Sequence, residues 1–191
     1  MTAQPTGHVK WSPNPVKQRL ALYTIEDVLS LPADAPRVEL RDGVMDLVPS
    51  PTYDHQDISG LLWFWLRQRA PKELRSSLGT GVAVSMNTTF EPDVVLVQAD
   101  VSGSHHYAIA SQVILAVEIV SPSTKRRDRM EKPARYAEVG VPHYWRIEQN
   151  PLHVFAYDLV NGRYELAADS DTELVLSAPF EIRLPIRDIT P

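Results

Sequence analysis

The chain has 191 residues, of which 43% are hydrophobic, and a formal net charge of −5. It is long enough for one well-buried core, and because it lacks cysteine it excludes disulfides, a cysteine nucleophile and a cysteine-based zinc site. The acidic balance argues against a general affinity for nucleic acid, although two basic stretches, RQRAPKELR and KRRDRMEKPAR, depart from it. No apolar run approaches the about 18 residues of a membrane span and no signal-like core is visible, so we expect a soluble, cytoplasmic protein.

The N-terminal residues 1–20 hold three prolines and no periodic apolar pattern, which predicts a flexible arm ahead of a single domain over 21–191. The domain opens with a predicted short helix in TIEDVLSLP, where Thr24 is the cap and Asp27 has the capping-box position. Extended runs on both sides of Asp42 and Gly43 then predict a tight hairpin.

A long amphipathic helix is predicted in DHQDISGLLWFWLRQRA, because its apolar residues recur at steps of three and four. Strands are predicted at 82–86, 93–97, 113–120, 144–148, 154–159 and 163–166, with a second hairpin turn at Asn161 and Gly162. Pro133 and Gly140 favour a short helix over 133–139 between two of these strands. The pattern is that of a mixed α/β protein whose central strands are its most buried part.

One carboxylate, Glu118, interrupts the apolar strand ILAVEIV. A lone buried carboxylate is costly unless it is neutralised, paired or bound to a metal. A second acid, Asp93, begins the apolar run of EPDVVLV, 25 residues earlier. If the two strands are neighbours, these acids face each other at one end and can hold a divalent cation. The alternative is structural, with Glu118 capping a backbone group or pairing with an arginine.

Four segments carry a resemblance to a known family: RVELRDGVMDLVPSPTYDHQ, EPDVV, VEIVSPST and RRDRMEKPARYAEVGVPHYW. In this order they resemble the Uma-two family, restriction-endonuclease-like proteins of the PD-(D/E)XK nuclease superfamily, from about Tyr23 to Tyr164. The resemblance implies an α/β restriction-endonuclease-like core, with a mixed central β-sheet flanked by helices. It also implies a site at the strand ends that uses Mg²⁺ or Mn²⁺ to cleave DNA.

The site residues of the family transfer by position. The resemblance makes Asp93 and Glu118 the two metal ligands and catalytic acids. The family's lysine belongs two residues after the second acid, but this chain has Val120 there, so the resemblance assigns that role to Lys132 in the following helix. Glu39 matches a position that contributes a further catalytic carboxylate.

Four cations precede that lysine in the basic stretch, and Asp128 lies among them as a predicted helix cap. They form either a solvated face or a set of phosphate contacts that position nucleic acid without reading its sequence. The set comprises Lys125, Arg126, Arg127 and Arg129.

Two histidines stand at family positions. His55 matches a recurrent histidine and either lines the site or has a helix-cap or hydrogen-bonding role. His143 replaces an acid that many relatives have before YW, which marks a side branch of the family.

Two function classes remain open. The first is a metal-dependent DNA endonuclease, expected as a homodimer because cutting two strands needs two active sites. The second is a catalytically weak or silent protein that keeps the nuclease fold to bind nucleic acid or a protein partner. A non-nuclease hydrolase with the same metal pair is a distant third.

Overall fold

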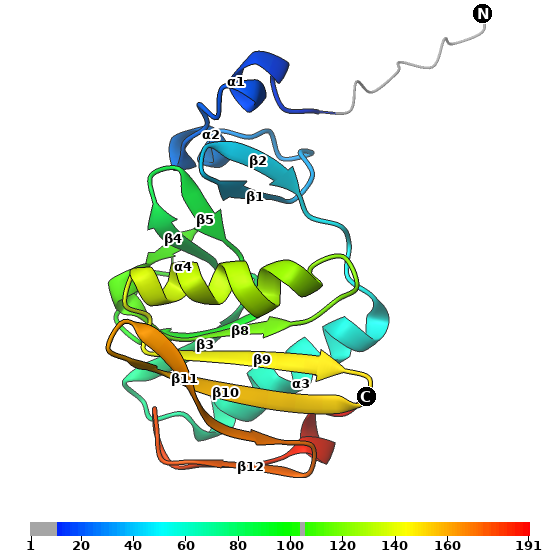
Figure 1. The fold of residues 1–191 in the computed structure, drawn as a ribbon, viewed down its shortest axis with the longest axis vertical. Coiled ribbons are helices and arrows are strands. Elements are labelled where there is room, and N and C mark those ends of the chain that lie inside the picture. Colours follow the sequence, from blue (N-terminus) through cyan, green and yellow to red (C-terminus); the bar gives the residue numbers. More distant parts are fainter. Residues whose placement is uncertain (1–10, 104–105) are drawn as a thin grey trace, which may run out of the picture.

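The computed structural model describes residues 11–103 and 106–191, and Figure 1 shows the order of their elements. The helical elements are α1 Pro15–Arg19, α2 Ile25–Leu29, α3 Tyr53–Arg69, the 3-10 turn η1 Ala110–Gln112, the π-helical segment η2 Arg127–Glu131, α4 Lys132–Glu138 and the 3-10 turn η3 Ile186–Ile189. The strands are β1 Val38–Arg41, β2 Val44–Leu47, β3 Leu74–Leu78, β4 Gly81–Ser85, β5 Thr88–Phe90, β6 Val94–Gln98, β7 Tyr107–Ile109, β8 Val113–Ile119, β9 His143–Gln149, β10 Leu152–Val160, β11 Arg163–Ser170, β12 Glu173–Leu176 and β13 Ile182–Pro185. Within the described ranges, no helix is long and apolar enough to cross a membrane.

Three sheets organise these strands. The largest has six strands in the order β11-β10-β9-β8-β6-β3, and it is mixed because β8 and β9 are parallel while the other neighbours are antiparallel. A five-stranded sheet has the order β2-β1-β5-β4-β7, and β12 pairs with β13. The five-stranded sheet forms the upper lobe in Figure 1, together with α1 and α2.

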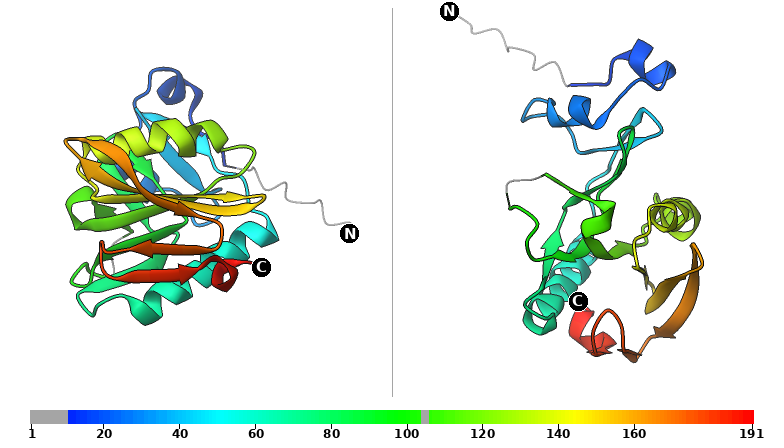
Figure 2. Two further views of the ribbon diagram at one scale, coloured as in Figure 1. Left: turned by 60° about the horizontal axis from the view of Figure 1, so that its bottom comes forward. Right: turned by 90° about the vertical axis from the view of Figure 1, so that its left-hand side faces the viewer.

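The six-stranded sheet separates the two main apolar clusters. On one face, α3 packs through Ile58, Leu62 and Leu66 against alternate residues of the central strands. On the other face, Tyr136 of α4 packs with Tyr144 of β9. Figures 1 and 2 show the sheet between these two helices. The amphipathic stripe predicted for the long helix is therefore confirmed, and its apolar face covers the central sheet.

Both predicted hairpin turns are confirmed. Asp42 and Gly43 have φ values of 46° and 81°, and Asn161 and Gly162 have φ values of 49° and 77°. Two successive residues with positive φ match the turn type that Asx-Gly pairs favour between antiparallel strands. Gly43 is also required by space, because a Cβ there would lie 2.0 Å from the carbonyl oxygen of Ala21.

The helix predicted over 133–139 is longer than its sequence signals indicate. α4 covers Lys132–Glu138 and continues directly from the π-helical turn of η2. At the junction, the Lys132 N–H bonds to the carbonyl of Arg127, five residues earlier. This wider turn accommodates Pro133, which has no N–H to donate and would clash in a regular α-helix interior.

The predicted arm over 1–20 is only partly described, because residues 1–10 lie outside the described ranges. Residues 15–19 form α1, with the side chain of Asn14 as its cap. The Gln18 side chain donates to the Met45 carbonyl at 2.7 Å and accepts from the Met45 N–H at 3.1 Å, so it extends the edge of β2. This contact to a distant strand fixes a segment whose own sequence predicts no order.

Candidate active site

Asp93 and Glu118 lie at the same end of two paired strands. In the β6–β8 ladder Val94 is opposite Val117, so Asp93 directly precedes the ladder and Glu118 directly follows the partner of Val94. The Asp93 N–H also donates to the Val117 carbonyl at 3.0 Å, so the two strands are still joined at this point. The charge of Asp93 is one of the influences that raise the pKa of Glu118, after burial as the largest.

The Asp93 carboxylate is held through one of its oxygens. Its Oδ2 accepts a hydrogen bond from the Ile119 N–H at 2.7 Å and lies 3.3 Å from Nε2 of His55, in the first turn of α3. Burial lowers the pKa of His55, but the hydrogen bond and the charge of Asp93 outweigh it and raise this pKa above its ordinary value. His55 lines the cavity and also pairs with Asp93, while Thr52 caps the helix.

Glu118 belongs to a buried group of side chains that we call the lysine cluster: Lys132, Glu118, Glu39, Asp128 and Tyr136. The Lys132 ammonium lies 2.8 Å from Glu118 Oε2, 3.0 Å from Glu39 Oε1 and 3.7 Å from Asp128 Oδ1. The Tyr136 hydroxyl donates to the other Glu118 oxygen at 3.0 Å. Both oxygens of Glu118 are therefore held by donors from α4.

Burial and charge oppose each other in this cluster. Burial would lower the pKa of Lys132, but its three carboxylate partners raise that pKa well above its usual range, so the ammonium stays charged. Burial likewise raises the pKa of Glu118 well above its ordinary value. Burial also favours the neutral form of Glu39, yet Lys132 and Arg127 together hold its pKa below the ordinary value. One ammonium thus contacts three carboxyl groups, one of which, Glu39, also pairs with Arg127.

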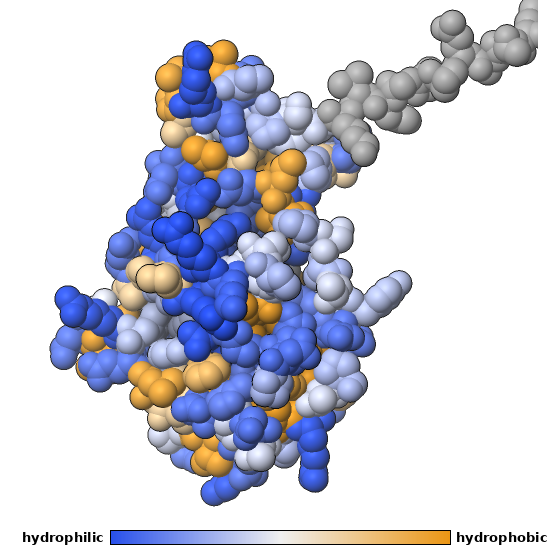
Figure 3. All heavy atoms as spheres, turned by 45° about the vertical axis from the view of Figure 1, so that its right-hand side comes forward, coloured by the Kyte–Doolittle hydropathy of each residue, from blue (hydrophilic) through white to orange (hydrophobic). Residues whose placement is uncertain are grey.

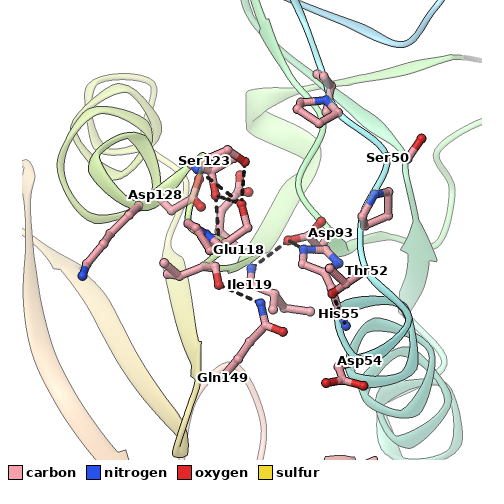
Figure 4. A pocket seen from close by; sticks show the side chains of 18 of the residues that line it. Ser50, Thr52, Asp54, His55, Asp93, Glu118, Ile119, Ser123, Asp128 and Gln149 are labelled. Atoms are coloured by element: carbon pink, nitrogen blue, oxygen red, sulfur yellow. Dashed lines mark hydrogen bonds and ion pairs between the residues drawn. The ribbon is translucent and has the colours of Figure 1, made fainter.

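A cavity of about 840 Å³ opens beside these acids. Figure 4 shows Asp93 and His55 on one side of it and Glu118 and Asp128 on the other. Figure 3 brings this side of the molecule forward and shows a surface that is hydrophilic over most of its area. Asp93, Glu118 and Asp128 all line the cavity, whereas Lys132 and Glu39 are absent from its described walls. The lysine thus contacts Glu118 from behind.

Ion pairs join the β1–β2 hairpin to the helix that carries the lysine. Glu39 pairs with both Lys132 and Arg127. The next pairs along the hairpin are Arg41 with Glu131 at 3.4 Å and Asp42 with Arg135 at 2.6 Å. These ion pairs connect the β1–β2 hairpin, which we call the hairpin lobe, to η2 and α4, which we call the site helix. Their partners are about 90 positions apart in sequence.

The four cations of the basic run do not form one continuous surface. Arg127 is directed inward to Glu39, and Arg129 pairs with Glu148 at 2.9 Å. Lys125 and Arg126 are exposed, and Lys125 lines the cavity. A run of adjacent charges along one helix therefore separates into inward and outward residues.

The donor chemistry fits a hard divalent cation. Asp93, Glu118 and Asp128 line one cavity, and Oδ1 of Asp128 is a buried carboxylate oxygen with no hydrogen-bond partner among the described residues. Oxygen ligands of this kind suit Mg²⁺ and Mn²⁺. No three acidic or histidine side chains of the described residues already lie close enough to form a ready set of direct ligands. Asp93 and Glu118 are thus the pair available to hold a cation, with water in the remaining positions.

Residues 25–187 match the family model of Uma2, whose description reads "Putative restriction endonuclease". The chain belongs to the Uma2 family. Its fold is similar to that of a solved structure described as a "putative nuclease belonging to DUF820 from Anabaena variabilis ATCC 29413", with a TM-score of 0.70 and 20% sequence identity over 87% of this chain and 97% of that one. No curated protein matches the chain. The family resemblance and the restriction-endonuclease-like fold expected from the sequence are confirmed.

Two buried members of the lysine cluster escaped the sequence reading of this Uma2 chain. The sequence indicates a helix cap at Asp128 and assigns no role to Tyr136. The available signal is their spacing: positions 128, 132 and 136 recur every four residues, so they share one helical face with the lysine. His143, in contrast, pairs with Asp158 at 2.7 Å across the β9–β10 ladder and does not line the cavity.

Proposed function

We propose that this Uma2 protein is a metal-dependent endonuclease that hydrolyses phosphodiester bonds in DNA. The observation that carries the proposal is the meeting of Asp93 and Glu118 at one end of two paired strands, on the wall of a single cavity. Membership of a family described as restriction endonucleases supports it, as does a fold shared with a protein described as a nuclease.

In this proposal Asp93 and Glu118 hold Mg²⁺ or Mn²⁺. The bound cation supplies an activated water and stabilises charge on the phosphate. Asp93 has a free oxygen for this purpose, because His55 and the Ile119 N–H engage only Oδ2. Glu118 is held in place by two donors, and each of its oxygens keeps a further lone pair for the cation.

Lys132 takes part electrostatically in this proposal. Its ammonium neutralises Glu118 and holds its orientation, while Glu39 fixes the ammonium from the far side. Its effect on the transition state is transmitted through Glu118, because the lysine does not line the cavity. Lys125 and Arg126 are the exposed cations placed to contact DNA phosphates, which position the duplex without reading sequence. We further propose a homodimer, since two strands require two active sites.

One observation favours a second candidate, a catalytically silent nuclease-fold protein that binds nucleic acid or a protein partner. Val120 replaces the family's lysine, and the ammonium of Lys132 is engaged by three carboxylates away from the cavity. A protein with this arrangement retains the fold and a polar cavity but lacks a cation free to face substrate.

Nicking of supercoiled plasmid DNA in Mn²⁺ separates the two candidates. We expect nicking by the parent protein that stops on chelation with EDTA and in both Asp93→Asn and Glu118→Gln. Asp93→Asn is included because it lies outside the lysine cluster, so its folding does not depend on that network. The control, Lys125→Met, keeps the metal site, and its loss should appear in substrate binding and diminish as salt is raised. A parent protein without activity in Mg²⁺ or Mn²⁺ favours the silent candidate.

A further inference from the structure

We propose that Asp128 is a third acidic residue of the cation site, where its carboxylate accepts a hydrogen bond from the water shell of the divalent cation. The proposal rests on the metal-dependent function proposed above, and it concerns a residue whose sequence position indicates only a helix cap.

The first observation is an unused acceptor in a buried place. Asp128 is 1% exposed, and its Oδ1 has no hydrogen-bond partner among the described residues. The ammonium of Lys132 is 3.7 Å away, within ion-pair range but too far for a hydrogen bond. A buried carboxylate oxygen without a donor costs free energy, so its place needs a reason beyond packing.

The second observation is the direction of this side chain. Asp128 lines the same cavity as Asp93 and Glu118, and Figure 4 shows it on the wall next to Glu118. Its backbone is fixed from two sides, because its N–H donates to the Thr124 carbonyl at 3.0 Å and its own carbonyl accepts from the Tyr144 hydroxyl. The carboxylate is thus held in position rather than left there by a mobile turn.

Glu39 is the acid to compare with Asp128, because it is also a partner of Lys132. It is as buried as Asp128 and lies 3.0 Å from the same ammonium. Its oxygens, however, also accept from Arg127 and from the Glu91 N–H, and it does not line the cavity. Of these two acids, only Asp128 lines the cavity, and only Asp128 has a buried oxygen without a hydrogen-bond donor among the described residues.

The chemistry of the cation explains why the contact is made through water. Mg²⁺ gives up its water reluctantly, and in proteins it is usually held by one or two carboxylates while it keeps several waters. Those waters are strong donors that need acceptors. The described residues contain no ready set of three direct ligands, which agrees with two direct ligands and an outer acceptor.

Calorimetric titration of the metal-free protein with Mn²⁺ tests this role without measuring cleavage. We expect Asp128→Asn to weaken Mn²⁺ binding by about 10- to 100-fold, the usual effect of removing an outer-shell partner of a metal. The control, Glu131→Gln, removes a charge from η2 at a residue that pairs with Arg41 and does not line the cavity, and it should stay close to the parent. Asp93→Asn should abolish binding. Asp128→Ser repeats the test with a smaller side chain if the circular dichroism of the asparagine variant shows misfolding.

Each remaining outcome overturns the inference. Parent-like binding by Asp128→Asn, with binding lost in Asp93→Asn, would make Asp128 structural while leaving the proposed function intact. Equal weakening in Asp128→Asn and Glu131→Gln would show that only the summed charge near the site matters. A parent protein that binds no Mn²⁺ would remove both this inference and the proposed metal-dependent function.

Discussion

Asp93, directly before β6, and Glu118, near the end of β8, are held in different ways. Asp93 is fixed by a backbone N–H and by His55, on the α3 side of the cavity. Glu118 is fixed by Lys132 and Tyr136, both from α4. A sequence motif treats these acids as equivalent. In the structure, a few neighbouring groups on the α3 side hold Asp93, whereas Glu118 on the α4 side belongs to a buried ionic network. Changes on the α4 side should therefore affect folding as well as the site.

Lys132→Met should have the largest effect, because it removes the cation of the network on the α4 side. It leaves Glu118, Glu39 and Asp128 buried without their common cation, so the free energy of unfolding should fall by about 3–5 kcal/mol. Metal-dependent cleavage should fall by about 10²-fold or more, the scale of one charge-stabilising group. Urea denaturation and plasmid nicking measure the two effects, and Lys125→Met serves as the exposed control. Unchanged stability would show that the network does not support the fold.

Tyr136→Phe gives a smaller and cleaner test of the α4 side. It removes the hydrogen bond to Glu118 but keeps the ring packed against Phe90 and Tyr144. A hydrogen bond to a charged group contributes about 1.5–3 kcal/mol, which is the loss we expect in urea denaturation. Tyr164→Phe is the matched control, because its hydroxyl donates to the neutral Val141 carbonyl and should cost about 0.5–1.5 kcal/mol. Equal losses in the two variants would argue against a charged Glu118.

His55→Phe tests the α3 side and should have the smallest effect on stability. Burial lowers the pKa of His55, but Asp93 outweighs it and raises this pKa in the folded protein above its ordinary value. Its contribution to stability is therefore complete below the unfolded pKa and is lost as the pH rises through the folded pKa. In EDTA, the difference in melting temperature between parent and variant should shrink from about pH 6 to pH 9. A difference that grows with pH would contradict the pairing with Asp93.

The sequence predicts the features that depend on residues close together in the chain. Asp42 and Gly43 predict their hairpin because few residue pairs accept positive φ, and the stripe of α3 predicts its buried face. The direction of Arg127 could not be predicted, since its partner Glu39 is 88 positions away. Two strands of the five-stranded sheet, β5 and β7, could not be predicted, because strands as short as Thr88–Phe90 have too few residues to show alternation.

The same distance explains why Asp128 and Tyr136 were not recognised as site residues. Their four-residue spacing with Lys132 was visible, but nothing in the sequence shows that this helical face turns toward Glu118 rather than solvent. That face is set by packing on β9, through Tyr136 and Tyr144, and by the π-helical turn before α4. Residue types were predictable here, whereas their contacts depended on tertiary structure.

The ionic fastening between the hairpin lobe and the site helix also bears on the order of folding. Its partners are about 90 residues apart, so each ion pair closes a very long loop. Contacts of such high sequence separation form slowly, because the chain loses the conformational entropy of closing the loop before the contact stabilises the closed state. We therefore expect the hairpin to be synthesised early but to pack against the site helix only after the segment beyond Arg135 has left the ribosome. The cation site would then be among the last parts of the molecule to mature.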